Sequence, residues 1–159
     1  MKALLYSVIG IFVIIGLLLG VLSISSRKQP ERGLLNGQLR PCPTTPNCVC
    51  SEQQVEGAFV EPLVYPTTAA DAWRKIKQAI DETGGIVLTE QNGYLHARYV
   101  TPLMRYVDDV ELRLDENKQL IHIRSASRVG RSDLGANRQR VGKIRSVFDK
   151  QTRKLKELE

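Results

Sequence analysis

The uncharged run from Ala3 to Ile24 is the feature that most constrains the fold of this chain. Its 22 residues are close to the roughly 20 that an α-helix needs to cross a hydrocarbon core of about 30 Å. A cleaved signal peptide has a shorter apolar core of about 7–15 residues, followed by small residues at the cleavage site. Here the run continues into SISSRK, and no cysteine follows closely enough to carry a lipid. We interpret residues 1–26 as an uncleaved transmembrane anchor, with a signal peptide as the alternative, and expect contact with a membrane through residues 3–24.

The charges that flank this run favour one orientation in the membrane, and the cysteines favour the other. Lys2 carries the side-chain charge on the N-terminal side, whereas Arg27, Lys28, Arg32 and Arg40 follow the run. This excess of basic residues would keep the following domain in the cytoplasm. Because the cysteine pattern indicates an oxidising compartment, we favour export. The prediction is a single-pass protein of the bacterial inner membrane with an extracytoplasmic C-terminal domain.

Three cysteines fall within the segment PCPTTPNCVCS. Cys42 and Cys48 bracket a proline-rich loop short enough to close as a disulfide, a bond that persists in oxidising compartments. Cys50 would then remain as a free thiol or form an intermolecular bridge. Two other interpretations stay open, namely structural free thiols and a metal or catalytic site. The spacing Cys-x5-Cys-x-Cys matches no standard zinc site and has no nearby histidine.

Positive charge is concentrated at the C-terminal end of the chain. Residues 124–159 hold 11 basic and 4 acidic residues, whereas residues 27–123 hold 11 basic and 13 acidic residues. Such polarity favours anionic partners, which include lipid head groups, acidic glycans and nucleic acid.

Residues 27–57 are rich in proline and glycine and lack apolar periodicity, so we expect a linker that carries the cysteine segment. Residues 58–159 form the expected folded domain. Its first helix is predicted from Thr68, which forms a capping box with Asp71, to a stop at Gly84. Apolar residues recur between these signals at spacings of three and four. Trp73 lies on the apolar face and is expected to be a core anchor because of its large apolar area.

Three or four strands are predicted after this helix. Asn92-Gly93 is a strong hairpin signal, and residues 115–118 form another turn. The strands are expected at residues 86–89, 94–100, 106–114 and 120–125. The order of elements indicates the α+β class, with an N-terminal transmembrane helix followed by a two-layer domain. In that domain an antiparallel meander sheet carries two helices on one face.

The second of these helices is predicted to begin at Asp133 as its N-cap and to end near Leu158. Asn137 takes an inward position on its first turn, so it must find hydrogen-bond partners in the neighbouring loop or strand. The apolar stripe of this helix consists of Leu134, Val141, Ile144, Phe148, Leu155 and Leu158.

Strand parity sorts the charged residues onto one face of the sheet. This polar face is either a solvated surface with cross-strand ion pairs or a shallow site with proton carriers and anion-binding arginines. A metal site is a weaker alternative, because positions on separate strands cannot be checked by spacing. The residues on this face are His96, Arg98, Asp109, Glu111, Arg113, His122 and Arg124.

The segment RSASRVGRSDLGANRQR, from Arg124 to Arg140, lies between the last strand and the last helix. Arginine binds carboxylate and phosphate with two parallel hydrogen bonds and keeps its charge near neutral pH. One hypothesis is that the segment binds an anion through Arg124, Ser125, Ser127, Arg128, Asn137 and Arg138. The alternative is internal: Arg128 and Arg138 pair with Asp108, Asp109 or Asp133 and lock the loop.

Several of these motifs together resemble a family of bacterial and plant proteins called domain of unknown function 1499. The motifs are PNCVCS at residues 46–51, the helix with Trp73, GYLHAR at 93–98, RYVDDVE at 105–111 and the arginine-rich segment at 124–140. The chain departs from the resemblance at Cys50, where the family more usually has serine, which leaves Cys42 and Cys48 as the favoured pair. The resemblance implies that the polar face and the arginine-rich segment form one shared unit, and it implies no activity.

The leading functional hypothesis is a membrane-anchored, extracytoplasmic module that binds an anionic envelope ligand, which could be a small molecule, a lipid head group or a glycan. A second hypothesis is an enzyme with His96 or His122 as general base and Asp109 or Glu111 as its partner. A third is a cytoplasm-facing domain that binds anionic lipid or nucleic acid. Nucleic acid is disfavoured because no aromatic residues interleave the arginines. We assign no catalytic residue and expect neither a cofactor nor a metal.

Overall fold

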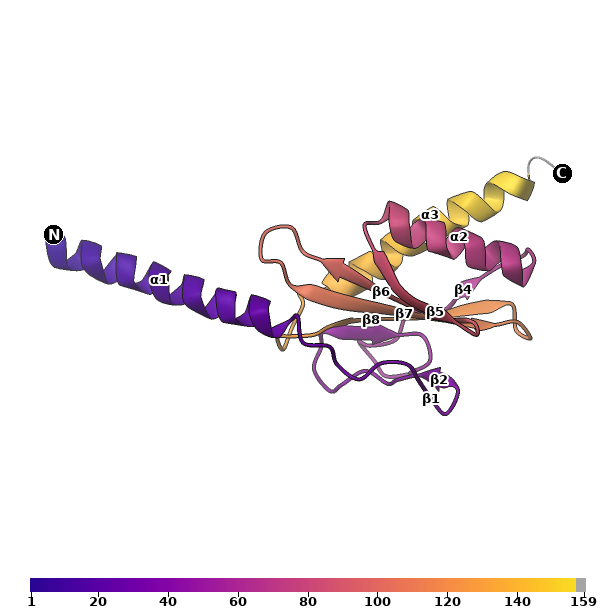
Figure 1. Ribbon diagram of the computed structural model, residues 1–159, viewed down its shortest axis with the longest axis horizontal. Helices are drawn as coiled ribbons and strands as arrows, with labels where there is room; N and C mark the ends of the chain where they lie inside the picture. The colour runs from indigo at the N-terminus through magenta and orange to yellow at the C-terminus, as the bar shows by residue number, and fades with distance from the viewer. Residues whose placement is uncertain (157–159) are drawn as a thin grey trace.

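A computed structural model describes residues 1–156, with side chains through residue 153 (Figure 1). Helix α1 (Lys2–Ser25) extends away from the rest of the protein, and none of its residues is buried. At 1.5 Å per residue it is about 36 Å long, enough to cross a bilayer core. Within the described residues it is the one helix that is long and apolar enough to do so.

The remainder is an α+β domain, as predicted, built on a six-stranded antiparallel sheet. The order of strands is β3-β8-β7-β6-β5, and β4 pairs with β8 beside β3. The predicted hairpin is confirmed, with Asn92 and Gly93 both at positive φ between β5 and β6. A separate two-stranded ribbon is formed by β1 and β2. The strands are β1 (Leu34–Leu35), β2 (Gln38–Leu39), β3 (Cys48–Cys50), β4 (Leu63–Val64), β5 (Ile86–Gln91), β6 (Tyr94–Val100), β7 (Val107–Asp115) and β8 (Leu120–Ser127).

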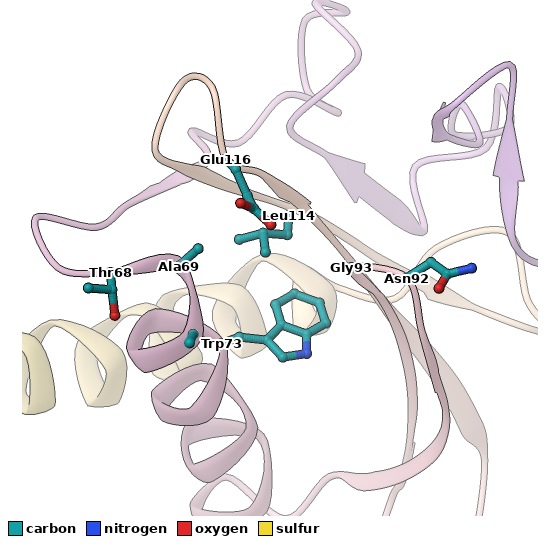
Figure 2. A pocket seen from close by; sticks show the side chains of 8 residues that line it. Thr68, Ala69, Trp73, Asn92, Gly93, Leu114 and Glu116 are labelled. Carbon is teal, nitrogen blue, oxygen red and sulfur yellow. The ribbon is translucent and has the colours of Figure 1, made fainter.

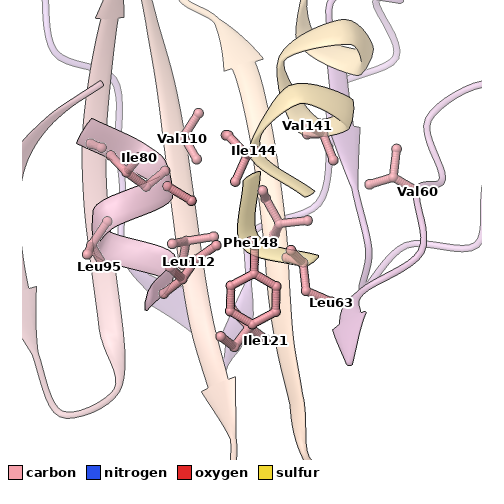
Figure 3. Close-up of a cluster of buried hydrophobic side chains, with 14 of the residues drawn as sticks. Val60, Leu63, Ile80, Leu95, Val110, Leu112, Ile121, Val141, Ile144 and Phe148 are labelled. Atoms are coloured by element: carbon pink, nitrogen blue, oxygen red, sulfur yellow. The ribbon is translucent and has the colours of Figure 1, made fainter. Parts of the chain in front are cut away.

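Helices α2 (Ala69–Glu82) and α3 (Ala136–Lys156) cover one face of this sheet, as predicted. The hydroxyl of Thr68 accepts a hydrogen bond from the amide of Asp71, which confirms the N-cap of α2. The apolar faces of both helices pack on the sheet in one core (Figure 3). Trp73 is half-buried at the margin of this core and donates a hydrogen bond to Glu90. The core includes Leu63, Ile76, Ile80, Leu95, Val110, Leu112, Ile121, Ile123, Val141, Ile144 and Phe148.

The start of α3 differs from the prediction. The helix begins at Ala136, because Leu134 and Gly135 both have positive φ and interrupt the helical path. Asp133 lies before this break, where its carboxylate accepts hydrogen bonds from the amides of Gly135 and Asn137. Leu134 points into solvent and is not part of the apolar stripe. Of the other stripe residues, Val141, Ile144 and Phe148 are buried as predicted, whereas Leu158 and the side chain of Leu155 lie outside the described residues.

Residues 27–57 do not form a free linker. They run across the face of the sheet opposite the helices, where β1 and β2 lie below the sheet in Figure 1. The amide of Gly33 reaches the carboxylate of Glu111 on β7, and the carboxylate of Glu52 accepts a hydrogen bond from Arg113 on β7. We call residues 26–60 the covering segment.

The predicted disulfide is confirmed between Cys42 and Cys48, with an S–S distance of 2.01 Å. It closes a loop of the covering segment beside β3. Cys50 is a buried free cysteine. Burial raises the pKa of the Cys50 thiol, so the thiol stays protonated near neutral pH.

Candidate functional site: a buried polar network

The centre of the polar face is an ion-pair cluster around Asp109 on β7. His96 on β6 lies with its Nε2 2.7 Å from Oδ1 of Asp109. Arg128 donates from Nε to Oδ2 at 2.8 Å and from Nη2 to Oδ1 at 2.7 Å. Burial alone would raise the pKa of Asp109, but the hydrogen bonds from His96 and Arg128 lower it to about 2. The carboxylate is therefore ionised at any physiological pH.

Arg32, from the covering segment, completes this cluster. Its Nη1 lies 2.7 Å from Nδ1 of His96 and 4.0 Å from the Asp109 carboxylate. The same Nη1 lies 2.9 Å from Nε2 of His96, so the guanidinium contacts both ring nitrogens. His96 is only 2% exposed. One edge of its ring nevertheless borders a hollow of about 500 Å³ lined by Gln29, Pro30, Arg32, Gly33, Leu88, Thr89, Gln91, Tyr94 and His96.

Glu111, two residues further along β7, is completely buried at 0% exposure. Its Oε1 accepts hydrogen bonds from the Tyr94 hydroxyl at 2.7 Å and from the Gly33 amide at 3.0 Å. Its Oε2 accepts from Nη1 of Arg124 at 2.9 Å. Burial and the neighbouring Glu111 carboxylate raise the pKa of Tyr94, so the phenol stays protonated and acts as a donor. Arg124 is thus occupied by a carboxylate of its own chain.

A third group lies at the far end of the same face. Arg113 donates from Nη2 to Oε1 of Glu52 at 2.6 Å, which ties the covering segment to β7. His122 lies with its Nδ1 3.3 Å from the Ser51 hydroxyl. Burial lowers the pKa of His122, so its imidazole is neutral near pH 7. His122 and His96 contact different carboxylates, so the structure does not combine the two histidines in one site.

Asn137 belongs to a separate network on the helix side of the sheet. Its Oδ1 accepts from the Ser125 hydroxyl at 2.6 Å and from Nη1 of Arg140 at 2.5 Å. Its Nδ2 donates to the backbone carbonyl of Asn47 at 2.9 Å and to the Ser127 hydroxyl at 3.0 Å. Asn137 is fully buried, as predicted.

The structure therefore divides the predicted site residues between two faces. Ser125, Ser127 and Asn137 lie on the helix side, whereas Arg124, on β8 opposite Glu111, and Arg128, which pairs with Asp109, lie on the polar side. The alternative prediction, that arginines of this segment pair with acidic residues of the same chain, is confirmed for Arg128, which pairs with Asp109. Asp108 instead pairs with Arg140, at 2.5 Å.

Two of the predicted site residues, Arg98 and Arg138, belong to none of these groups. Arg138 is exposed and donates to the backbone carbonyl of Gly57 at 2.8 Å. Arg98 follows His96 on the same face of β6, is exposed, and forms no ion pair among the described side chains. Sequence patterns missed Arg32, Tyr94 and Arg140. Tyr94 could have been predicted, because it lies on the same face of its strand as His96. Arg140 could also have been predicted, because it ends the arginine-rich segment. No pattern in the sequence identifies Arg32.

A second hollow, of about 540 Å³, lies beside α2 at the same β5–β6 turn: Asn92 and Gly93 line it, whereas Gln91 and Tyr94 line the first hollow. Figure 2 shows the indole of Trp73 facing it beneath Leu114, with Asn92 and Gly93 at one side. Glu116 is its one ionisable lining residue. It holds no pair of titratable groups that could transfer a proton between them.

Within the described part of the chain, no group of three or more His, Cys, Asp or Glu side chains is placed to bind a metal ion. What the polar face offers chemically is a buried histidine beside an ionised carboxylate, together with arginines held at fixed positions.

Residues 38–148 match the family described as Protein of unknown function (DUF1499). This chain belongs to the DUF1499 family. The matched region includes His96, Asp109, Glu111 and the whole arginine-rich segment, and it begins after Arg32 and Gly33. For a DUF1499 domain, the ion pairs of Arg124 and Arg128 therefore lie within the family region, while the residues that cover them come partly from outside it.

The chain is also similar to the Thylakoid lumenal 17.9 kDa protein, chloroplastic, of Arabidopsis thaliana. The two are 39% identical over 80 residues, which is 49% of this chain and 32% of the relative. The chain thus spans about a third of the length of that relative. No solved structure matches this chain.

Proposed function

We propose that this DUF1499 protein is a membrane-anchored, extracytoplasmic module of the cell envelope that binds an anionic ligand at the hollow beside Arg32 and His96. The single observation that carries the ligand class is the charge of this hollow. It is lined by an arginine and contains no acidic lining residue among the described side chains.

The arginines of the strand-to-helix segment are not free to bind this ligand. Arg128 forms an ion pair with Asp109, and Arg124 forms an ion pair with Glu111. Arg32 contacts Asp109 at 4.0 Å, a longer distance than the 2.7 Å of Arg128, and it lines the hollow. Arg98, which forms no ion pair among the described side chains, adds a further cation on the same face of the sheet. A carboxylate or phosphate group of a small molecule, head group or glycan would neutralise this local excess of positive charge.

Two observations support the extracytoplasmic location. The Cys42–Cys48 disulfide is typical of oxidising compartments. The Arabidopsis relative is described as a lumenal protein. A fusion of alkaline phosphatase after Glu159 tests the location, because that enzyme is active only after export. An inactive fusion combined with an active cytoplasmic reporter would refute it and would favour the inner-leaflet alternative.

Binding is tested on full-length protein in nanodiscs by titration with inorganic phosphate, glycerol 1-phosphate and galacturonic acid. We expect Arg32→Gln to lower the affinity for the anion by about tenfold or more, because one charge-assisted hydrogen bond contributes about 1.5–3 kcal/mol. Arg40→Gln is the matched control, since Arg40 lies in the same covering segment and forms a surface ion pair with Glu31. Equal affinities of the wild type and Arg32→Gln would overturn the proposal.

One observation favours a second candidate function at the same hollow. The Asp109 carboxylate, 2.7 Å from Nε2 of His96, holds the imidazole in a fixed orientation beside the hollow, as a carboxylate orients a general-base histidine. If the module is an enzyme, glycerol 1-phosphate incubated with the protein yields a product detectable by mass spectrometry, and His96→Gln abolishes the product while the fold is retained. A pure binding module leaves the probe unchanged in both proteins.

A further inference from the structure

The anchor helix ends directly on the domain. Ser26, the residue after α1, is fully buried, and its hydroxyl accepts a hydrogen bond from the Val107 amide at 3.2 Å. Arg128 donates from Nη1 to the carbonyls of Ser26 and Arg27, each at 3.3 Å. Because Arg128 is itself held by Asp109, the end of α1 is fixed to the sheet with no intervening tether.

Two loops surround this junction, one between β6 and β7 and one between β8 and α3 (Figure 1). Each presents a leucine to solvent: Leu103 is 85% exposed and Leu134 is 92% exposed. No other large apolar side chain described in the domain is as exposed. The two most exposed leucines therefore lie at the end of the domain that faces the anchor.

Each of the two loops contains a residue with a side chain in the left-handed region. Leu134 has φ +53°, and Arg105, two residues after Leu103, has φ +55°. Residues with a side chain rarely adopt this left-handed region, and such strain is concentrated at functional sites. Here it directs Leu134 away from the core, although the apolar spacing of α3 would have placed it inward.

The charge around the two leucines is positive. Arg27 and Lys28 follow the anchor, and Arg105 and Arg131 lie in the two loops; all four are exposed. Asp133 is the one acidic residue in residues 26–28, 101–106 and 128–135, and its carboxylate is engaged by two backbone amides. Exposed leucine with surrounding lysine and arginine is the composition of segments that lie in the interface of an anionic membrane.

We infer that this end of the domain docks on the bilayer surface, with Leu103 and Leu134 in the head-group region and the four basic residues against anionic head groups. The inference rests on the membrane anchoring that is part of the proposed function, and it is independent of the anion-binding hollow. A bilayer is the occupant that the geometry favours, because the fixed junction places both loops beside the point where α1 would leave the membrane.

The test uses full-length protein in vesicles of phosphatidylcholine and phosphatidylglycerol that contain phosphatidylcholine brominated on its acyl chains. Tryptophan is introduced as Leu103→Trp and as Leu134→Trp. The native Trp73 gives a common background, since it lies in the first turns of α2 at the other end of the domain. Val64→Trp is the matched control: Val64 is 66% exposed on β4, away from α1.

We expect the bromine quenching of Leu103→Trp and Leu134→Trp to exceed that of Val64→Trp by about twofold and to grow with the fraction of anionic lipid. Equal quenching of all three variants, in protein that floats with the vesicles, would refute the docked surface and leave the anchor intact. Protein that fails to float with the vesicles would refute the anchor and the docking together. Phosphate binding by the wild type and Arg32→Gln is measured separately, so neither result changes the test of the hollow.

Discussion

Arg128 and Asp109 form a bidentate ion pair that joins the loop before α3 to the middle of the sheet. The two contacts measure 2.8 and 2.7 Å, and both side chains are almost completely buried. The same guanidinium holds the carbonyls of Ser26 and Arg27. One side chain thus links the anchor helix, the sheet and the arginine-rich segment.

Arg128→Ala is expected to lower the free energy of unfolding by about 3–5 kcal/mol, because it leaves the buried Asp109 carboxylate without its main cation. Denaturant unfolding of the full-length protein in detergent measures the loss. Arg131→Ala, an exposed arginine three residues away, is the control and should change stability by no more than about 0.5 kcal/mol. Equal stability of the two variants would contradict a structural role for Arg128.

Asp109 should make stability depend on pH in the acid range. Its folded pKa of about 2 lies below the ordinary value of 3.8, so the unfolded chain binds the proton more readily. The contribution is present above about pH 4 and is lost as pH falls towards 2, with a total of about 2 kcal/mol at 1.36 kcal/mol per pKa unit. The free energy of unfolding between pH 5 and pH 2, measured for the wild type and Asp109→Asn, checks this. An acid slope that is identical in both proteins would show that Asp109 is not responsible.

Asn137→Ala should destabilise the domain by about 1–3 kcal/mol, because the Asn47 carbonyl and the Ser125 hydroxyl lose a buried partner. The change in melting temperature reports the effect. Gln139→Ala lies on the exposed side of the same helical turn and serves as the comparison. If both variants have the same melting temperature, the Asn137 network does not hold α3 to the sheet.

Reduction of the Cys42–Cys48 disulfide should cost about 2 kcal/mol, the chain-entropy value for a loop of about six residues. The melting temperature of the wild type should fall on addition of dithiothreitol. A variant with both Cys42→Ala and Cys48→Ala should melt at the reduced value with or without the reductant. A further drop in that variant would mean that the reductant acts elsewhere.

Sequence patterns correctly predicted the parts of the fold in which side chains recur at a regular spacing. Alternation along β6 and β7 correctly placed His96, Asp109 and Glu111 on one face, with Leu95, Val110 and Leu112 on the other. The inward position of Asn137 followed from helical spacing and is confirmed.

The covering segment followed no pattern that a sequence could reveal. Part of its contact with the sheet is made by backbone groups, such as the Gly33 amide that binds Glu111 across 78 positions of sequence. Such a contact requires no particular side chain and has no period. The polar face was therefore visible in the sequence, but its burial was not.

Leu134 shows the opposite failure. Its spacing matched the apolar stripe of α3, yet the left-handed conformation at Leu134 and Gly135 removes it from the helix. Backbone dihedral angles decided its orientation, and spacing alone does not encode them.

The burial of Ser26 also has a mechanical meaning. A transmembrane helix joined to its domain by a loose tether can tilt or rotate without turning the domain. Here the last turn of α1 leads straight into a residue held by β7 and Arg128. Rotation of α1 about its axis would therefore turn the domain with it and change which face of the domain a neighbouring molecule meets.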